Sequence, residues 1–230
     1  MNFPGLVGRL AEARDRIRFH QERAGWTHPV RVVAVTKSHG ADAVRAALAA
    51  GLLEVGENRV QEALSKQAEL PDLPVRWHLI GSVQRNKVRQ IVGRFALIHS
   101  VDRESLAVEL DRRIVAAGAA PQPLLVEVNC SGEPAKGGVE PEALPALLAV
   151  IAGSPALELR GLMTLAAQSD DERVQRRAFG LLRSLRDRMQ SAGYALPELS
   201  MGMSGDFPVA VEEGATLVRL GTLLFGERPR

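Results

Sequence analysis

The sequence is poor in cysteine, in aromatic residues and in long apolar runs. Its single cysteine, Cys130, excludes an internal disulfide framework and favours a reducing compartment. Aromatic residues make up 4% of the chain, so its apolar mass is mostly Ala, Val and Leu, as in helices packed on buried strands. No run of 18 apolar residues exists, and the N-terminus lacks a charged-then-apolar signal pattern. We therefore expect a cytoplasmic protein without a transmembrane span.

The chain also lacks a strong excess of charge and any Pro/Gly/Ser-rich linker. Its formal net charge is +2 over 230 residues, and arginines alternate with acids along positions 170–188. This alternation is typical of a solvated helix face, so we expect no nucleic-acid partner. With 46% hydrophobic residues and no low-complexity segment, the sequence predicts one domain spanning 1–230.

Short apolar runs alternate with longer segments of helical period. Strands are expected at 31–36, 53–56, 76–80, 96–100, 124–129, 159–165, 198–201 and 217–220. Helices are expected at 3–24, 42–50, 59–69, 86–92, 103–117, 140–152, 171–192, 208–213 and from about 222. The helix at 171–192 is expected to bury a stripe of Val174, Leu181, Leu182, Leu185 and Met189.

Eight strands separated by helices predict a single (β/α)₈ barrel (a TIM barrel) preceded by an extra N-terminal helix, and an open doubly wound sheet is the alternative. In either fold, ligands bind at the carboxyl ends of parallel strands. Polar and glycine residues gather after most of the predicted strands, which points to a site at that end.

Lys37 directly follows the first predicted strand, at 31–36. Desolvation at such a place would lower its pKa and free an amine nucleophile. Taken alone, a strand-end lysine that extends to water is the simpler interpretation.

The loops after the last two strands favour the interpretation of Lys37 as an amine nucleophile in a site. Ser200, Gly202, Ser204 and Gly205 offer hydroxyl and backbone N–H donors, and Gly221-Thr222 stands where a final helix begins. A phosphate site at this position recurs in barrels, although ordinary turn glycines would look alike.

Arg219 interrupts an apolar strand and must have a partner, which could be a carboxylate such as Glu57 or an acceptor on a ligand. His78, within a strand, is treated as a core residue unless a ligand reaches it. His39, His78 and His99 do not form a metal-ligand spacing with Cys130, so we expect no metal. Cys130 is expected to be a small buried hydrophobe, and Lys136, in the loop 133–138, to be solvated.

The quoted residues belong to segments that resemble a known family. These segments are Val33–Lys37, Gly56-Glu57-Asn58-Arg59-Val60-Gln61-Glu62, Trp77-His78-Leu79-Ile80-Gly81, Gln84-Arg85-Asn86-Lys87, Gly161-Leu162-Met163, Leu199–Ser204, Val218–Thr222 and Phe225-Gly226. In this order the chain resembles the pyridoxal phosphate homeostasis proteins (the YggS/PROSC family), which are related to the N-terminal barrel of alanine racemase. Thr36, Ser38 and Val83 depart slightly from the usual pattern.

The resemblance implies that the chain binds pyridoxal 5′-phosphate (PLP) as a cofactor. Lys37 falls on the Schiff-base lysine, and Arg219 on the arginine that faces the pyridine nitrogen. Other implied cofactor-binding positions are Asn58 and His78 near the ring, Ser200, Ser204, Gly221 and Thr222 at the phosphate, and Met201. Lys136 falls on a loop lysine that is implicated in some relatives as a second attachment or transfer point.

The sequence favours a non-catalytic carrier over an enzyme. An arginine opposite the ring nitrogen is a poor proton donor, which weakens PLP as an electron sink. A racemase also needs a second base, and the only tyrosine, Tyr194, is expected at the opposite rim of the barrel. The leading hypothesis is PLP homeostasis, with buffering and delivery of PLP to apo-enzymes by a monomer and an effect on amino-acid and keto-acid metabolism. The alternatives are a weak PLP-dependent racemase or lyase, and a barrel that uses a lysine base on an ordinary phosphate substrate.

Overall fold

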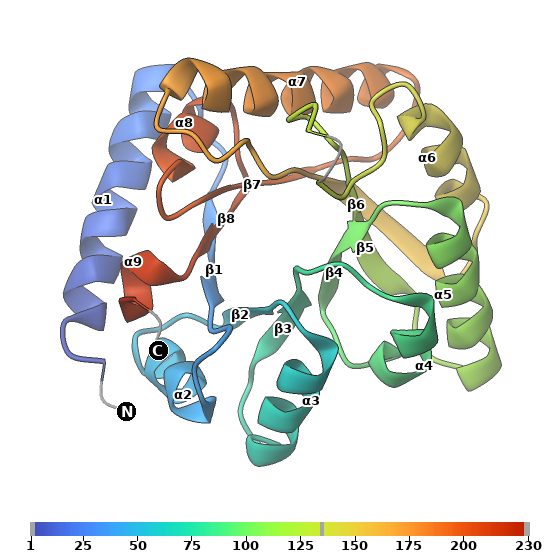
Figure 1. Cartoon of the computed structure of the whole chain (residues 1–230), viewed down its shortest axis with the longest axis horizontal. Helices are drawn as coiled ribbons and strands as arrows, with labels where there is room; N and C mark the ends of the chain where they lie inside the picture. The colour runs from blue at the N-terminus through green and yellow to red at the C-terminus, as the bar shows by residue number, and fades with distance from the viewer. Residues whose placement is uncertain (1–2, 134–135, 228–230) are drawn as a thin grey trace.

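The computed structural model describes residues 3–133 and 136–227, and its centre is a closed barrel of parallel strands in chain order (Figure 1). The strands are β1 (Arg31–Val35), β2 (Glu54–Glu57), β3 (Arg76–Leu79), β4 (Leu97–Val101), β5 (Gln122–Glu127), β6 (Leu157–Met163), β7 (Glu198–Met203) and β8 (Leu217–Leu220). Pairing of β1 with β8 closes the barrel, so the (β/α)₈ prediction is confirmed and the open-sheet alternative is wrong.

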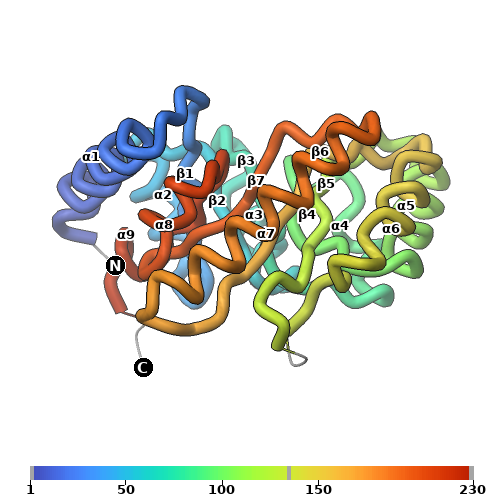
Figure 2. The backbone as a smooth tube through the Cα atoms, turned by 90° about the horizontal axis from the view of Figure 1, so that it is seen from above, coloured from blue at the N-terminus to red at the C-terminus, as the bar shows by residue number. Residues whose placement is uncertain are grey.

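Helices surround the barrel and connect its strands. They are α2 (Ala41–Ala49), α3 (Val60–Glu69), the 3₁₀ turn η1 (Arg85–Lys87) with α4 (Val88–Ile91), α5 (Glu104–Ala117), α6 (Leu144–Ala152), α7 (Glu172–Ser191), α8 (Phe207–Glu212) and α9 (Thr222–Phe225). The extra helix α1 (Leu6–Ala24) precedes β1 and packs against α8 and α9, as both views show (Figures 1 and 2). In the described part of the chain, no helix combines the length and the apolar character that crossing a membrane would require.

Several details differ from the sequence prediction. The strands expected at 124–129 and 159–165 each begin and end two residues earlier, as β5 and β6. The helix expected from 140 begins only at Leu144, after a turn that contains Pro141. On α7, Val174 and Leu181 are 38% and 37% exposed, whereas Gln175 and Phe179 are buried. The buried stripe therefore lies around Ala178, Phe179, Leu182 and Leu185, because the angle at which a helix packs on the sheet decides which of two neighbouring stripes faces inward.

Most strands bury both faces, which explains why they are nearly continuous in apolar residues. In β6, Glu158 and Arg160 stay exposed. The outward faces pack against the helices in the main core. The inward faces form a separate layer inside the barrel, made by Val33, Leu97, Leu125, Met163 and Leu217. These five side chains fill part of the barrel interior.

Polar side chains fill the barrel above this apolar layer, towards the carboxyl ends of the strands. His78, His99, Ser200 and Arg219 are all buried and are joined by hydrogen bonds. Glu127 ends β5 near them and is also buried. Burial raises the pKa of Glu127 to about 7, Asp102 adds to this rise, and Arg219 opposes it.

This pKa predicts a specific pH dependence of stability for Glu127. Glu127 stays protonated to a higher pH in the folded chain than in the unfolded chain. Protonation of Glu127 therefore stabilises the folded chain fully below pH 4.5, and this stabilisation is lost as pH rises through 7. We expect the Glu127→Gln chain to gain about 3 kcal/mol of unfolding free energy, relative to the parent chain, between pH 4.5 and pH 8. Urea unfolding of both chains at the two pH values measures this difference.

The matched control is Glu158→Gln, which changes an exposed glutamate on β6 and should leave the pH dependence unaltered. If the unfolding free energies of the Glu127→Gln and parent chains changed equally with pH, the raised pKa of Glu127 would be contradicted.

Candidate functional site

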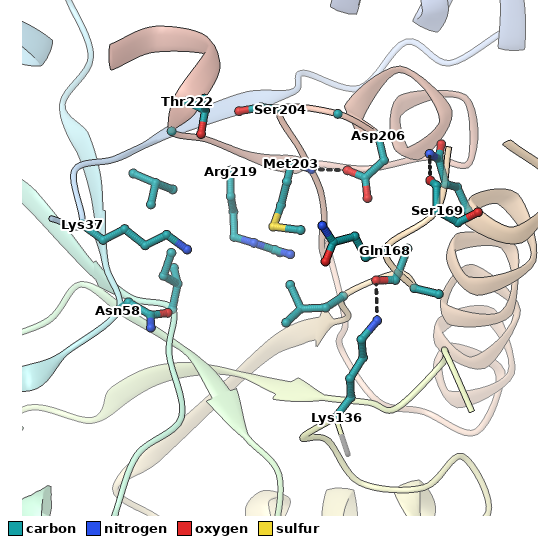
Figure 3. A pocket seen from close by; sticks show the side chains of 18 of the residues that line it. Lys37, Asn58, Lys136, Gln168, Ser169, Met203, Ser204, Asp206, Arg219 and Thr222 are labelled. Atoms are coloured by element: carbon teal, nitrogen blue, oxygen red, sulfur yellow. Dashed lines mark hydrogen bonds between the residues drawn. The ribbon is translucent and has the colours of Figure 1, made fainter. Parts of the chain in front are cut away.

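A cavity of about 610 Å³ opens at the carboxyl ends of the strands, where the sequence predicted a site. Its lining comes from nearly all around the barrel, including Lys37 after β1, Asn58 after β2 and Lys136 after β5 (Figure 3). Ser204, Arg219, Gly221 and Thr222 line it from β7 and β8. Its volume is that of a typical small-molecule pocket.

Lys37 lies beyond the end of β1, and its amine points into the cavity towards Arg219 (Figure 3). The next residue, Ser38, has a φ of 68°, so the chain turns sharply just past the lysine. Thr36 is still held to the barrel through its N–H, which donates to the Gly56 carbonyl oxygen at 3.2 Å. The strand thus ends where the lysine side chain can enter the cavity.

Hydroxyl groups from two different loops meet on one side of the cavity. Ser204, after β7, and Thr222, at the start of α9, lie close together in Figure 3. The Ser204 Oγ accepts a hydrogen bond of 3.1 Å from the Leu223 N–H, which ties the two loops to each other. No atom lies within 4 Å of where a Cβ on Gly205 would be, so the cavity wall is open there. Hydroxyls beside a helix start suit an anionic group such as a phosphate ester.

Arg219 projects from β8 into the centre of the site. Its Nη1 donates to the Ser200 Oγ at 2.7 Å, and its Nη2 donates to the Thr164 carbonyl oxygen at 3.0 Å. Burial lowers the pKa of Arg219 to about 10, and Asp206 and Glu127 oppose this shift. The guanidinium therefore remains charged at neutral pH.

Glu57, which the sequence left open as the partner of Arg219, is not that partner. Its carboxylate accepts hydrogen bonds from Lys66 and from the Thr36 hydroxyl instead. Arg219 is held by a hydroxyl and a carbonyl, both neutral acceptors.

A chain of hydrogen bonds runs from Arg219 across the barrel. Arg219 can only donate, so the Ser200 hydroxyl oxygen accepts from it, and the same oxygen is hydrogen-bonded to the Nδ1 of His99 at 2.9 Å. The Nε2 of His99 is in turn hydrogen-bonded to the Nδ1 of His78, also at 2.9 Å. Burial lowers the pKa of His78 to about 3 and that of His99 well below its usual range, so both rings are neutral. This network fixes Arg219 from below.

The predicted residues Ser200, Met201 and His78 are outside the cavity lining. Ser200 and His78 belong to the polar layer beneath it, and the Met201 side chain is buried in the main core. Sequence reasoning considered His99 only as a metal ligand and missed its link to Ser200. Strand alternation was the available signal, because His99 lies two residues after the inward-facing Leu97.

Lys136 lines the cavity on the side away from Lys37 and is not simply solvated (Figure 3). Its Nζ donates to the Ala166 carbonyl oxygen at 2.8 Å and pairs with Glu133 at 2.6 Å. Positions 134 and 135 of this loop lie outside the described residues.

Sequence reasoning also missed several lining residues. Asp206 ends the polar run after β7, and its carboxylate accepts a hydrogen bond from the Met203 N–H. Burial raises the pKa of Asp206, and Arg219 opposes this rise. Gln168 and Ser169 come from the loop after β6, which carries no pattern that distinguishes it from other loops.

Other candidate chemistry finds no support in the geometry. Cys130 is buried, and burial raises its pKa to about 12, so it is a thiol at neutral pH. Within residues 3–133 and 136–227, no group of three His, Cys, Asp or Glu side chains is placed to hold a metal ion.

The donor set of the cavity fits PLP. It offers a primary amine at Lys37, a pair of hydroxyls at Ser204 and Thr222 for a phosphate, and a buried cation at Arg219 between them. These groups surround one cavity of suitable volume, and they come from strand ends that pair with each other around the barrel.

Comparisons with known proteins agree with this geometry. Residues 9–229 match the family model described as alanine racemase, N-terminal domain. The pyridoxal phosphate homeostasis protein of Aquifex aeolicus is 45% identical over 96% of this chain and 97% of that protein. The protein of the same name from Pseudomonas aeruginosa is 46% identical over 97% of this chain and 96% of that protein.

The chain is also similar to a solved structure of a PLP-bound protein. PipY of Synechococcus elongatus PCC7942, determined with PLP bound, has a TM-score of 0.84 at 40% identity and covers 96% of this chain and all of that chain (100%). The chain therefore belongs to the alanine racemase N-terminal domain family and, within it, to the pyridoxal phosphate homeostasis proteins.

Proposed function

We propose that this chain binds PLP in the barrel cavity and acts in PLP homeostasis, with Lys37 as its Schiff-base lysine. The observation that carries this proposal is that the Lys37 amine, the buried Arg219 and the hydroxyls of Ser204 and Thr222 surround one cavity. The PLP bound in PipY, at 40% identity, supports the choice of ligand.

Each lining residue has a role in this proposal. When bound, PLP supplies an aldehyde that condenses with a primary amine and releases water. Lys37 provides that amine, while Ser204, Gly221 and Thr222 hold the phosphate beside the start of α9. Arg219 would face the ring nitrogen and Asn58 would lie beside the ring, since both line the cavity that the Lys37 amine enters.

The remaining predicted residues act from behind the cavity wall. Ser200 bonds directly to Arg219, and His78 acts through His99 and Ser200, so both hold the guanidinium in place. Met201 contributes through its backbone, because its side chain is buried in the core. Lys136 offers a second amine at the edge of the cavity, suited to transient contact with the ligand as it enters or leaves.

Arg219 also favours a carrier over an enzyme. With a pKa of about 10 it stays protonated at neutral pH and leaves the ring nitrogen without a full proton, which weakens PLP as an electron sink. We propose a non-catalytic carrier that buffers PLP and delivers it to apo-enzymes, as a monomeric cytoplasmic protein with one domain over 1–230. The relatives that bear the name of homeostasis proteins support this proposal.

Removal of the Lys37 amine tests the proposed attachment of PLP. The Lys37→Ala chain, mixed with PLP, is expected to lose the visible absorbance of lysine-bound cofactor, because the other lining lysine, Lys136, lies on the side of the cavity away from Lys37. Borohydride reduction followed by peptide mass spectrometry should find the pyridoxyl group on Lys37 in the parent chain. Lys87→Ala, which changes a lysine of η1 outside the cavity lining, serves as the control and should keep both signals. Absence of the band from the parent chain would refute PLP binding.

Measurement of turnover separates a carrier from an enzyme. The loaded protein, incubated with a panel of amino acids, should show turnover well below about 1 s⁻¹, the low end of typical enzyme values. Enantiomer analysis and keto-acid assays measure it. The same loaded protein should activate an apo PLP enzyme in the presence of a trap for free PLP. Turnover above about 1 s⁻¹ would contradict the carrier proposal, and activation abolished by the trap would contradict direct delivery.

A further inference from the structure

A largely buried group of charged side chains contacts the residues on both sides of Lys37 and has no place in the function described so far. It consists of Glu57 at the end of β2, and Glu62 and Lys66 one turn apart on α3, and we call it the Lys66 cluster. Glu57 and Glu62 belong to the segment 56–62 that carries part of the family resemblance. None of the three lines the cavity, so their role cannot be contact with a ligand there.

Lys66 is 4% exposed, which is unusual for a lysine. Its Nζ donates to the Glu57 Oε1 at 2.6 Å, to the Glu62 Oε1 at 3.0 Å and to the Thr36 carbonyl oxygen at 2.8 Å. An ammonium has three donors, so each of them has a partner. Two of those partners are carboxylates, and the third is the backbone of the residue that precedes Lys37.

The same cluster holds the residues on both sides of Lys37. The Thr36 hydroxyl donates to the Glu57 Oε1. On the other side, the Ser38 N–H donates to the Glu62 Oε1 at 2.6 Å. Thr36 and Ser38 are therefore both fixed by side chains from the next strand and helix of the barrel.

Ser38 needs such support because its φ is 68°. Among the residues that the structure describes, it is the only one other than glycine with a positive φ. A side-chain-bearing residue keeps this conformation only where its surroundings impose it. The conformation matters for function, because it sets the direction in which the chain leaves β1 and hence the direction of the Lys37 side chain.

We propose that Glu57, Glu62 and Lys66 are positioning residues, which hold the Thr36–Ser38 turn so that the Lys37 amine points into the cavity. They act through the backbone on either side of the lysine. The inference rests on the proposed function only in assigning PLP as the ligand of that amine.

Glu62 is the residue to change, because its side chain is 26% exposed and its loss leaves the buried Glu57–Lys66 pair intact. Removal of Lys66 would instead leave Glu57 buried without its cation and would endanger folding. Glu62→Ala removes the acceptor of the Ser38 N–H, whereas Glu62→Gln keeps an amide oxygen in its place. Glu69→Ala, at the exposed far end of α3, is the matched control for helix effects.

Two measurements are made on each variant. Hydrogen exchange of the Ser38 amide, followed by NMR without PLP, is expected to accelerate at least ten-fold in Glu62→Ala, because the hydrogen bond that protects it is gone. The dissociation rate of PLP from the loaded chain, followed by capture on an excess of apo-enzyme, is expected to rise about ten-fold. Glu62→Gln should restore most of both values, and Glu69→Ala should change neither.

The outcomes separate this inference from the proposed function. Faster Ser38 exchange with unchanged PLP dissociation would make the cluster merely structural and would overturn the positioning role. Equal effects in Glu69→Ala would attribute them to α3 as a whole and would overturn it too. If the parent chain bound no PLP, the proposed function would fail, while unchanged Ser38 exchange in Glu62→Ala would overturn the inference on its own.

Discussion

Closure of the barrel between its first and last strands is the constraint on which the site depends. The pairing of β1 with β8 places Val33 beside Arg219 and Ala34 beside Leu220. Lys37 follows Ala34 by three residues, and Gly221 and Thr222 follow Leu220 directly, so they line the same cavity although they are far apart in the sequence. Because parallel strands all end at one rim, the same closure brings Asn58 and Ser204 to that rim. The amine and the proposed phosphate site are neighbours for a purely topological reason.

The second constraint is the cost of burying polar groups inside the closed barrel. A charged guanidinium in the barrel interior is tolerated only with partners, and Arg219 has Ser200 and Thr164. Its charge in turn opposes the effect of burial on Glu127 and on Asp206. Arg219 therefore lines the cavity and also lowers the pKa values of the carboxyl groups of Glu127 and Asp206.

The site is thus built in two tiers. Side chains such as Lys37, Ser204 and Thr222 line the cavity, while others determine where those side chains point. His78, His99 and Ser200 support Arg219 from below, and the Lys66 cluster holds the turn that carries Lys37. Two tiers of this kind explain why the segments that identify the family include residues that do not line the cavity.

The sequence by itself determined the order of the elements, the barrel class and the lining residues that carry the proposed chemistry. Continuous apolar runs predict strands buried on both faces, and a polar residue after such a run lies at the ligand-binding rim, which located Lys37, Asn58, Ser204 and Thr222. Only the tertiary structure decided the pairing partners of the buried charges. Glu57 binds Lys66 and not Arg219, and Ser200 lies under the cavity wall, because register and strand tilt decide which side chains meet. Local patterns carry burial and period, which depend on each strand alone, whereas contacts between side chains distant in the sequence exist only once the barrel has closed.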